Sequence, residues 1–238
     1  MAIADDALWP RASAWLAAGT GHELGVVGVP LNRSVSPCRY DEGPTMIREA
    51  LIRFSVHHYE SGTDLRNLGV KDHGDLQADN ESAPGLLREV VSTGSMETIW
   101  AFLGGDNGVT YAGVQSLAFP LDRVGLITFD AHHDVRHLEN GLHNGNPVRA
   151  LIEAGLPGRN VVQIGIQSFA NSPEYAAYCH DQGIRVITTD QIARQGLHHL
   201  LPLVIAEWSD QFDALYVDFD LDVLDRSYVP GCPGARPG

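Results

Sequence analysis

The feature that most constrains the fold of this chain is an apolar segment that ends in three side chains able to bind metal. The segment Val124–Phe129 is followed by Asp130, His132 and Asp134 at alternate positions. An apolar run of this length is typical of a buried strand in a parallel sheet. Ligands of α/β proteins bind at the carboxyl ends of such strands. Carboxylate and imidazole donors together indicate a borderline divalent cation such as Mn²⁺.

A second apolar segment leads into another acidic cluster. Ala214–Val217 is followed by Asp218, Asp220 and Asp222. Carboxylates that lie close together repel one another and lose hydration unless a cation lies between them. A helix cap explains a single aspartate after a strand, but it does not explain two such clusters. The pattern therefore predicts one metal centre built from the ends of two strands.

Strand-like and helix-like segments alternate along most of the chain. Strands are predicted at residues 23–29, 98–103, 124–129, 161–165, 185–188 and 212–218. Helices are predicted at residues 43–54, 108–118, 147–154, 173–182 and 190–207, the last disturbed at Pro202. This alternation predicts an α/β fold with three α/β/α layers and a mostly parallel central sheet. Because no linker or internal repeat divides the 238 residues, we expect a single domain spanning 1–238.

Net charge, cysteine spacing and the lengths of the apolar segments exclude some binding partners and cellular locations. The net charge is −14 and the isoelectric point is near 5.0, which argues against nucleic acid and anionic membrane surfaces. Three widely spaced cysteines form no CxxC pair, so a reducing compartment is expected, and we predict a cytoplasmic protein. The first ten residues lack the apolar stretch of a signal peptide, and no apolar run is long enough to cross a membrane.

Three motifs together resemble the signatures of the ureohydrolases, the family of arginase, agmatinase and formimidoylglutamase. They are Gly104-Gly105-Asp106, the segment Asp130–Asp134 and the segment Asp220–Asp225. The segments 26–30 and 43–48 also look like the first strand and helix of that family, so the resemblance covers roughly residues 23–238. It implies an arginase-like fold and a binuclear manganese centre that activates water for attack on a guanidino or formimidoyl carbon.

The resemblance also implies ligand roles. Asp130 and Asp220 would bridge two ions, His132 and Asp222 would bind one of them, and Asp134 would bind the other. Asp134 and His143 are the expected catalytic residues, although an exposed loop histidine is an equal alternative for His143.

The first motif departs from the family pattern, which continues with a histidine ligand where this chain has Asn107. An amide oxygen binds Mn²⁺ more weakly than imidazole does, so we expect one of the two ions to be weakly held. The alternative is that Asn107 only caps the helix that begins at Gly108.

Arg136 follows the second motif by two residues. A guanidinium there can hold a substrate carboxylate through two parallel hydrogen bonds. Agmatine has no carboxylate and formimidoylglutamate has two, so Arg136 favours formimidoylglutamate. The alternative is a surface ion pair with Glu139.

The segment His143–Pro147 resembles the His-Gly-x-Pro loop of the family. Its register places Asn144, not His143, where arginase and agmatinase carry a proton-shuttling histidine, which again favours formimidoylglutamase. We expect Asn144 and Asn146 to bind substrate.

These expectations combine into one function. The chain is predicted to hydrolyse N-formimidoyl-L-glutamate to L-glutamate and formamide in histidine breakdown, with two Mn²⁺ per subunit. The alternatives are a guanidino hydrolase of the agmatinase or arginase type, or a non-catalytic paralogue that binds little metal. We expect a small-molecule substrate, no nucleic-acid or membrane partner, and a homo-oligomer.

The resemblance also predicts that the family's C-terminal helix and strand are missing after Gly238. On that view a slot should separate the strands that end at Phe129 and Asp218.

Overall fold

The computed structural model describes residues 6–208 and 211–237, so the first and last residues of the expected domain, Met1 and Gly238, lie outside the described part. The chain divides into two compact units. One comprises residues 1–32 and 38–109, and the other comprises residues 33–37 and 110–238. Each unit is built on its own parallel sheet.

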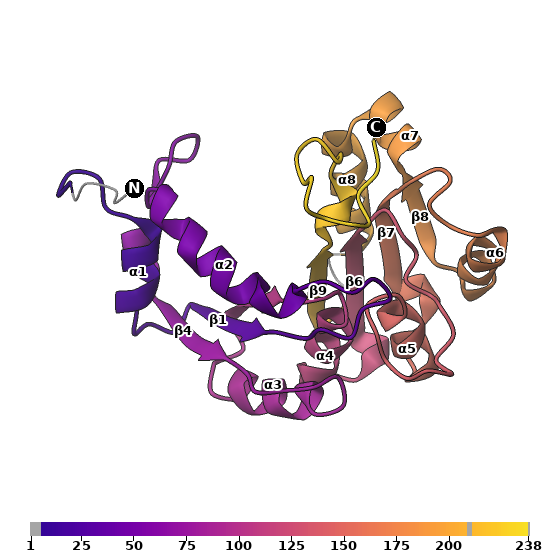
Figure 1. The fold of residues 1–238 in the computed structure, drawn as a ribbon, viewed down its shortest axis with the longest axis horizontal. Coiled ribbons are helices and arrows are strands. Elements are labelled where there is room, and N and C mark those ends of the chain that lie inside the picture. The colour runs from indigo at the N-terminus through magenta and orange to yellow at the C-terminus, as the bar shows by residue number, and fades with distance from the viewer. Residues whose placement is uncertain (1–5, 209–210, 238) are drawn as a thin grey trace. The chain divides into compact units, whose positions relative to one another are not determined.

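The first unit contains a three-stranded sheet in the order β4-β1-β5. Its strands are β1 (Leu24–Val29), β4 (Val70–Asp75) and β5 (Ile99–Gly104). Its helices are α1 (Ala12–Ala18), α2 (Gly43–Ala50) and α3 (Ala83–Val91), and α2 and α3 lie on opposite faces of the sheet (Figure 1). A short antiparallel hairpin pairs β2 (His57–His58) with β3 (Thr63–Asp64).

The glycine motif after β5 requires close backbone approach. The amide of Gly105 donates to the carbonyl of Val29, and the amide of Asp106 donates to the carbonyl of Leu31. A β-carbon on Gly105 would lie 2.1 Å from the Leu31 carbonyl oxygen. Only glycine fits this turn, which explains the second glycine of the motif.

The second unit contains a four-stranded sheet in the order β8-β7-β6-β9, with every neighbouring pair parallel. Its strands are β6 (Val124–Phe129), β7 (Val161–Ile166), β8 (Arg185–Thr188) and β9 (Ala214–Phe219). Its helices are α4 (Val109–Ser116, which begins at the boundary between the units), α5 (Pro147–Glu153), α6 (Pro173–Gln182), α7 (Thr189–Gln195) and α8 (Leu197–Trp208).

Alternating residues of β6 and β7 face two different helical layers. Leu126 and Val161 pack in a core with residues of α4, α5 and α6. Ile127 and Val162 pack in a second core with residues of α7 and α8. Burial on both faces is what the continuous apolar runs of these strands require. The predicted fold class, an α/β protein with parallel strands between two helical layers, is confirmed.

Two features of the fold differ from the sequence prediction. The helix predicted from Asp190 to Glu207 is divided into α7 and α8 at Gly196, which has a φ of +82°, and α8 continues through Pro202. The N-cap of α7 is Thr188, whose side chain accepts from the amide of Gln191. Strand β4 and helices α1 and α3 were not predicted, and the polar composition of β4 explains why its strand signal is weak.

The predicted slot between the strands ending at Phe129 and Asp218 is absent, so that expectation was wrong. β6 and β9 are hydrogen-bonded neighbours from Val124 opposite Ala214 to Phe129 opposite Phe219. Among the described residues, no helix is both long and apolar enough to cross a membrane.

Candidate metal centre

The pairing of β6 with β9 brings the two acidic clusters side by side. Phe129 lies opposite Phe219, so Asp130 and Asp220 leave the sheet at neighbouring positions. The amide of Asp220 donates to the carbonyl of Phe129 at 2.9 Å, which continues the strand pairing to the first residue of each cluster. The carboxyl edge of the sheet is therefore acidic at this point.

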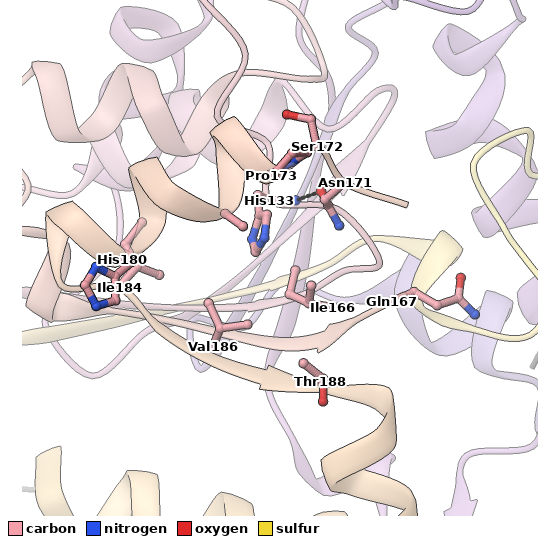
Figure 2. Close-up of a pocket in the computed structure, with 11 residues that line it drawn as sticks. His133, Ile166, Gln167, Asn171, Ser172, Pro173, His180, Ile184, Val186 and Thr188 are labelled. Atoms are coloured by element: carbon pink, nitrogen blue, oxygen red, sulfur yellow. Dashed lines mark hydrogen bonds between the residues drawn. The ribbon is translucent and has the colours of Figure 1, made fainter. Parts of the chain in front are cut away.

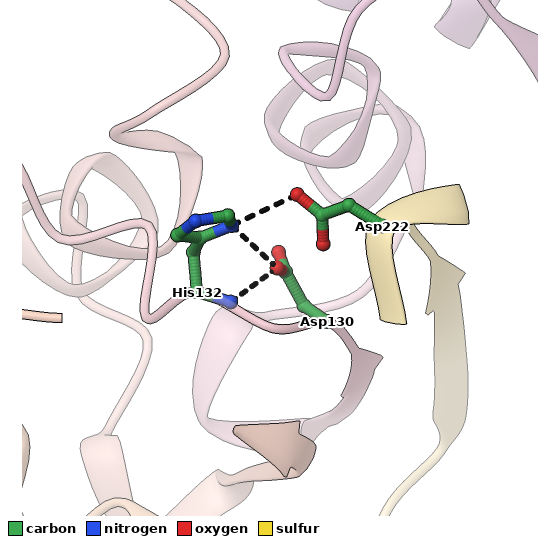
Figure 3. A group of neighbouring side chains, drawn as sticks. All are labelled: Asp130, His132 and Asp222. Carbon is green, nitrogen blue, oxygen red and sulfur yellow. Dashed lines mark hydrogen bonds and ion pairs between the residues drawn. The ribbon is translucent and has the colours of Figure 1, made fainter. Parts of the chain in front are cut away.

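Three of the predicted ligands converge there. Possible ligand atoms of Asp130, His132 and Asp222 all lie within 4.8 Å of one another (Figure 3). His132 Nδ1 lies 2.8 Å from Asp222 Oδ2 and 3.6 Å from Asp130 Oδ1. Two backbone amides fix the carboxylates, because His132 N donates to Asp130 Oδ1 at 2.6 Å and Ala131 N donates to Asp222 Oδ1 at 3.1 Å.

Two more of the predicted ligands, Asp134 and Asp220, act on the same cluster through their charge. Asp134, Asp220 and Asp222 each raise the pKa of Asp130. Asp220 caps the short helix Leu221–Val223, with Oδ1 accepting from the amide of Asp222 at 2.9 Å. Asp134 has a φ of +52°, in the left-handed region that side chains other than glycine rarely adopt. Such local strain is concentrated at functional sites.

The acidic groups are shifted as expected for carboxylates crowded in a dry site. Burial, followed by the charges of neighbouring aspartates, raises the pKa of Asp130 well above its usual value. Burial and the charge of Asp222 raise the pKa of Asp220 to about 7. Burial opposes ionisation of Asp222 as well, but the hydrogen bond and charge of His132 outweigh it and lower the pKa of Asp222.

This donor set fits a divalent cation. A cation between the carboxylates removes the repulsion that raises the pKa values of Asp130 and Asp220. Two aspartates and one imidazole are the mixture of oxygen and nitrogen ligands that suits Mn²⁺.

Only one of the two adjacent histidines faces the cluster. His133 is buried and points elsewhere, with its Nδ1 2.7 Å from Gln163 Oε1. Burial lowers the pKa of His133, so its imidazole is neutral at pH 7.

Two polar residues that the sequence analysis did not select hold this loop. Gln163 Nε2 donates to the carbonyl of His133 at 2.9 Å. Asn171 Oδ1 accepts from the amide of His133 at 2.9 Å, and Asn171 Nδ2 donates to the carbonyl of Ala131 at 2.9 Å. The one available signal was Gln163 itself, a polar residue inside an otherwise apolar strand.

Arg136 packs over the loop that contains His143. A β-carbon on Gly145 would lie 2.7 Å from Arg136 Cδ, and His143 Nδ1 accepts from the amide of Gly145 at 3.0 Å. Burial, followed by the charges of Arg136 and Arg33, lowers the pKa of His143. Within the described residues, no ion pair joins Arg136 to Glu139, so the surface-pair alternative has no support.

Asn144 and Asn146 both support this loop. Asn144 Oδ1 accepts from the amide of Val35 at 2.9 Å. Asn146 is fully buried, with Nδ2 donating to the carbonyls of His137 and Gly141 and Oδ1 accepting from the amide of His143. This geometry makes Asn146 a support of the loop rather than a substrate contact, because its amide has no accessible surface.

Asn107 belongs to the first unit, where it follows the glycine turn. The amide of Gly108 donates a hydrogen bond to Asp106 Oδ1 at 2.9 Å. The capping role considered for Asn107 at this amide is therefore filled by its neighbour.

Comparison with known proteins adds independent evidence. The sequence pattern of the arginase family matches residues 22–238. Formimidoylglutamase of Halalkalibacterium halodurans is 36% identical over 224 residues, which cover 90% of this chain and 70% of that protein.

Solved structures of formimidoylglutamases are also similar to this chain. The crystal structure of formimidoylglutamase from Bacillus subtilis has a TM-score of 0.89 at 29% identity, with 99% of this chain and 78% of that chain covered. Formiminoglutamase of Trypanosoma cruzi, solved with Mn²⁺, has a TM-score of 0.83 at 26% identity, with 96% and 81% of the two chains covered.

Proposed function

The chain belongs to the arginase family, and we propose that it is a manganese-dependent hydrolase that converts N-formimidoyl-L-glutamate and water to L-glutamate and formamide. The observation that carries this proposal is the convergence of Asp130, His132 and Asp222 from two separate segments. Its relatives at 36% and 29% identity are formimidoylglutamases.

Asp130, His132 and Asp222, with Asp134 and Asp220, are the residues proposed to hold the metal. Bound there, Mn²⁺ supplies a Lewis acid that lowers the pKa of water and polarises the substrate. A cation bound at His132 Nδ1 would replace the proton shared with Asp222 Oδ2, and the neutral ring would then carry its proton on Nε2. The amides of Ala131 and His132 keep the carboxylates in place during the exchange.

Asp134 is proposed to carry the proton during hydrolysis, and His143 is proposed to hydrogen-bond the leaving nitrogen. Because His143 Nδ1 accepts from the amide of Gly145, the proton of the neutral imidazole is on Nε2. This Nε2–H can donate a hydrogen bond to the leaving nitrogen, and the proton that this nitrogen gains is proposed to come from the attacking water through Asp134. The lowered pKa of His143 keeps this form at neutral pH.

Arg136 is proposed to bind a carboxylate of the substrate. Replacing Arg136 with alanine should raise KM for N-formimidoyl-L-glutamate by roughly 30-fold, since a hydrogen-bonded charge pair contributes about 2 kcal/mol. Turnover of agmatine, which has no carboxylate, should hardly change. Steady-state kinetics on both substrates measure this.

The matched control for Arg136 is Arg194→Ala, which removes an exposed guanidinium that pairs with Asp190 on α7. It should leave KM unchanged. An equal loss on both substrates in Arg136→Ala would assign Arg136 to loop structure instead.

Asn107 is proposed to be a weak ligand for one of the ions. Replacing it with histidine should tighten the weaker manganese binding step by about tenfold, because imidazole is the better donor for Mn²⁺. Calorimetric titration of the metal-free protein measures both steps. Asn67→His, an exposed asparagine in the same unit, is the control.

The proposal for Asn107 fails under either of two outcomes. One is that the unsubstituted protein already retains two equivalents of manganese through dialysis against a chelator. The other is that Asn107→His and Asn67→His bind manganese with equal affinity.

The free thiols support a proposal about the cellular location. Cys38, Cys179 and Cys232 are all free in the structure. Free thiols fit a reducing compartment, and we propose that the enzyme acts in the cytoplasm.

A further inference from the structure

The second unit contains a cavity that the proposed reaction does not use. It has a volume of about 580 Å³ and lies between α6 and the strands β7 and β8. None of Asp130, His132 or Asp222 is among its lining residues. Its volume is in the range of sites that bind small organic molecules.

One buried polar group faces this cavity. His133 is 3% exposed and lines the cavity, and its ring points from the loop toward Ile166 and Val186 (Figure 2). Its backbone amide and carbonyl are engaged by Asn171 and Gln163. The ring nitrogen Nε2 has no hydrogen-bond partner among the described residues, and it is not one of the atoms buried without a partner, so it is open to the cavity.

The orientation of the Gln163 side chain decides whether His133 Nε2 is a donor or an acceptor. The carbonyl of His133 can only accept, so the Gln163 atom that faces it is the amide nitrogen Nε2. The other atom, Oε1, can only accept, and it faces His133 Nδ1 at 2.7 Å. Nδ1 is therefore the protonated nitrogen, and in the neutral ring Nε2 is an acceptor available to a molecule in the cavity.

The remaining wall is mostly apolar. Its apolar surface comes from residues that include Ile166, Ala176, Ile184 and Val186. No aspartate, glutamate, lysine or arginine lines it, and its polar residues besides His133 are Gln167, Asn171, Ser172, His180 and Thr188. A charged ligand would lose its hydration without gaining a partner of opposite charge. An uncharged, flat or apolar molecule with one hydrogen-bond donor matches both the wall and Nε2.

We propose that this cavity is a second binding site, for an uncharged and largely apolar or aromatic small molecule that donates one hydrogen bond to His133 Nε2. The site is separate from the metal centre because His132 and His133, adjacent in the chain, face opposite directions. Asn171 lies in its wall and also holds the carbonyl of Ala131 and the amide of His133.

The loop formed by residues 130–134 contributes to both the metal centre and the cavity. A ligand that packs against His133 and Asn171 restrains the segment from which Asp130 and His132 project. Resting on the proposed function, this predicts that ligand and manganese bind more tightly together than alone, with the same factor in both directions.

Indole and 1-methylindole test the binding site directly. They have nearly the same shape, but only indole can donate a hydrogen bond. Calorimetric titration of the metal-free protein should show indole binding, with 1-methylindole weaker by roughly fivefold, the net value of one hydrogen bond. His133→Phe should remove this difference.

A pair of alanines on α6 provides variants far from the metal loop. Ala176→Phe should fill the cavity and abolish indole binding, whereas Ala177→Phe, at an exposed position outside the lining, should leave it unchanged. Equal binding of indole and 1-methylindole, or indole binding that survives Ala176→Phe, would overturn the proposal.

Because these titrations use metal-free protein, they do not depend on the proposed reaction. Indole binding without any hydrolytic activity would refute only the proposed function. Manganese-dependent hydrolysis without indole binding would refute only the second site.

Discussion

Replacing Asp130 with asparagine should abolish hydrolysis of N-formimidoyl-L-glutamate while the protein remains folded. Asp130 is buried at the end of β6, and its carboxylate faces His132 and Asp222. The amide of asparagine has the same shape but no charge to hold a cation. Because metal stabilisation of a transition state amounts to several kcal/mol, kcat/KM should fall by roughly a thousandfold.

The control for Asp130→Asn is the same chemical change at the exposed Asp122. Asp122→Asn should retain both manganese and activity, and metal analysis beside the kinetics links the two losses in Asp130→Asn. Normal turnover by Asp130→Asn, or an equal loss in Asp122→Asn, would exclude this metal centre.

Replacing Asp220 with asparagine should make the metal-free protein more stable at neutral pH and remove its stabilisation by manganese. Burial and the charge of Asp222 raise the folded-state pKa of Asp220 to about 7, from a usual value of 3.8. A raised carboxyl pKa contributes stability that is present below pH 4 and is lost as the pH rises through 7. The free energy involved is on the order of a few kcal/mol, and it is shared with Asp130, whose pKa the charge of Asp220 also raises.

Thermal melts between pH 5 and pH 8, with chelator or with Mn²⁺, measure this effect. Metal-free unsubstituted protein should lose stability as the pH rises, and Mn²⁺ should restore it by binding only the folded state. Metal-free Asp220→Asn should show a flatter pH dependence and no response to Mn²⁺.

Asp222→Asn is a control that should change the stability of the metal-free protein in the opposite direction to Asp220→Asn. The hydrogen bond and charge of His132 lower the pKa of Asp222, so this carboxylate stabilises the protein above its unfolded pKa and loses that contribution as the pH falls. Asp222→Asn should therefore weaken the metal-free protein at neutral pH. If both variants shift the melting temperature in the same direction, the charge arrangement inferred here is incorrect.

The strands that form the centre of the second unit were predictable because burial on both faces leaves a continuous apolar run. β6 and β7 are such strands, and both were predicted to within one residue. β4 has the sequence Val-Lys-Asp-His-Gly-Asp and has no such run. Strand order is not encoded by any local pattern, which is why the neighbour of β6 was misjudged.

The same limit applies to the candidate centre. The alternate spacing of Asp130 and His132 at a strand end indicated ligands, and their meeting with Asp222 needed only parallel strands that share an edge. The supporting bonds of Asn146, Gln163 and Asn171 join residues far apart in sequence or inside loops. Nothing in the local sequence distinguishes such an amide from one that contacts a substrate.

The most direct test of the account is the rate of formamide release from N-formimidoyl-L-glutamate by protein reconstituted with Mn²⁺. The account predicts turnover that disappears with chelator, returns with Mn²⁺, and greatly exceeds the hydrolysis of agmatine or arginine. Protein that holds manganese yet releases no formamide, or that hydrolyses agmatine or arginine faster, would contradict it.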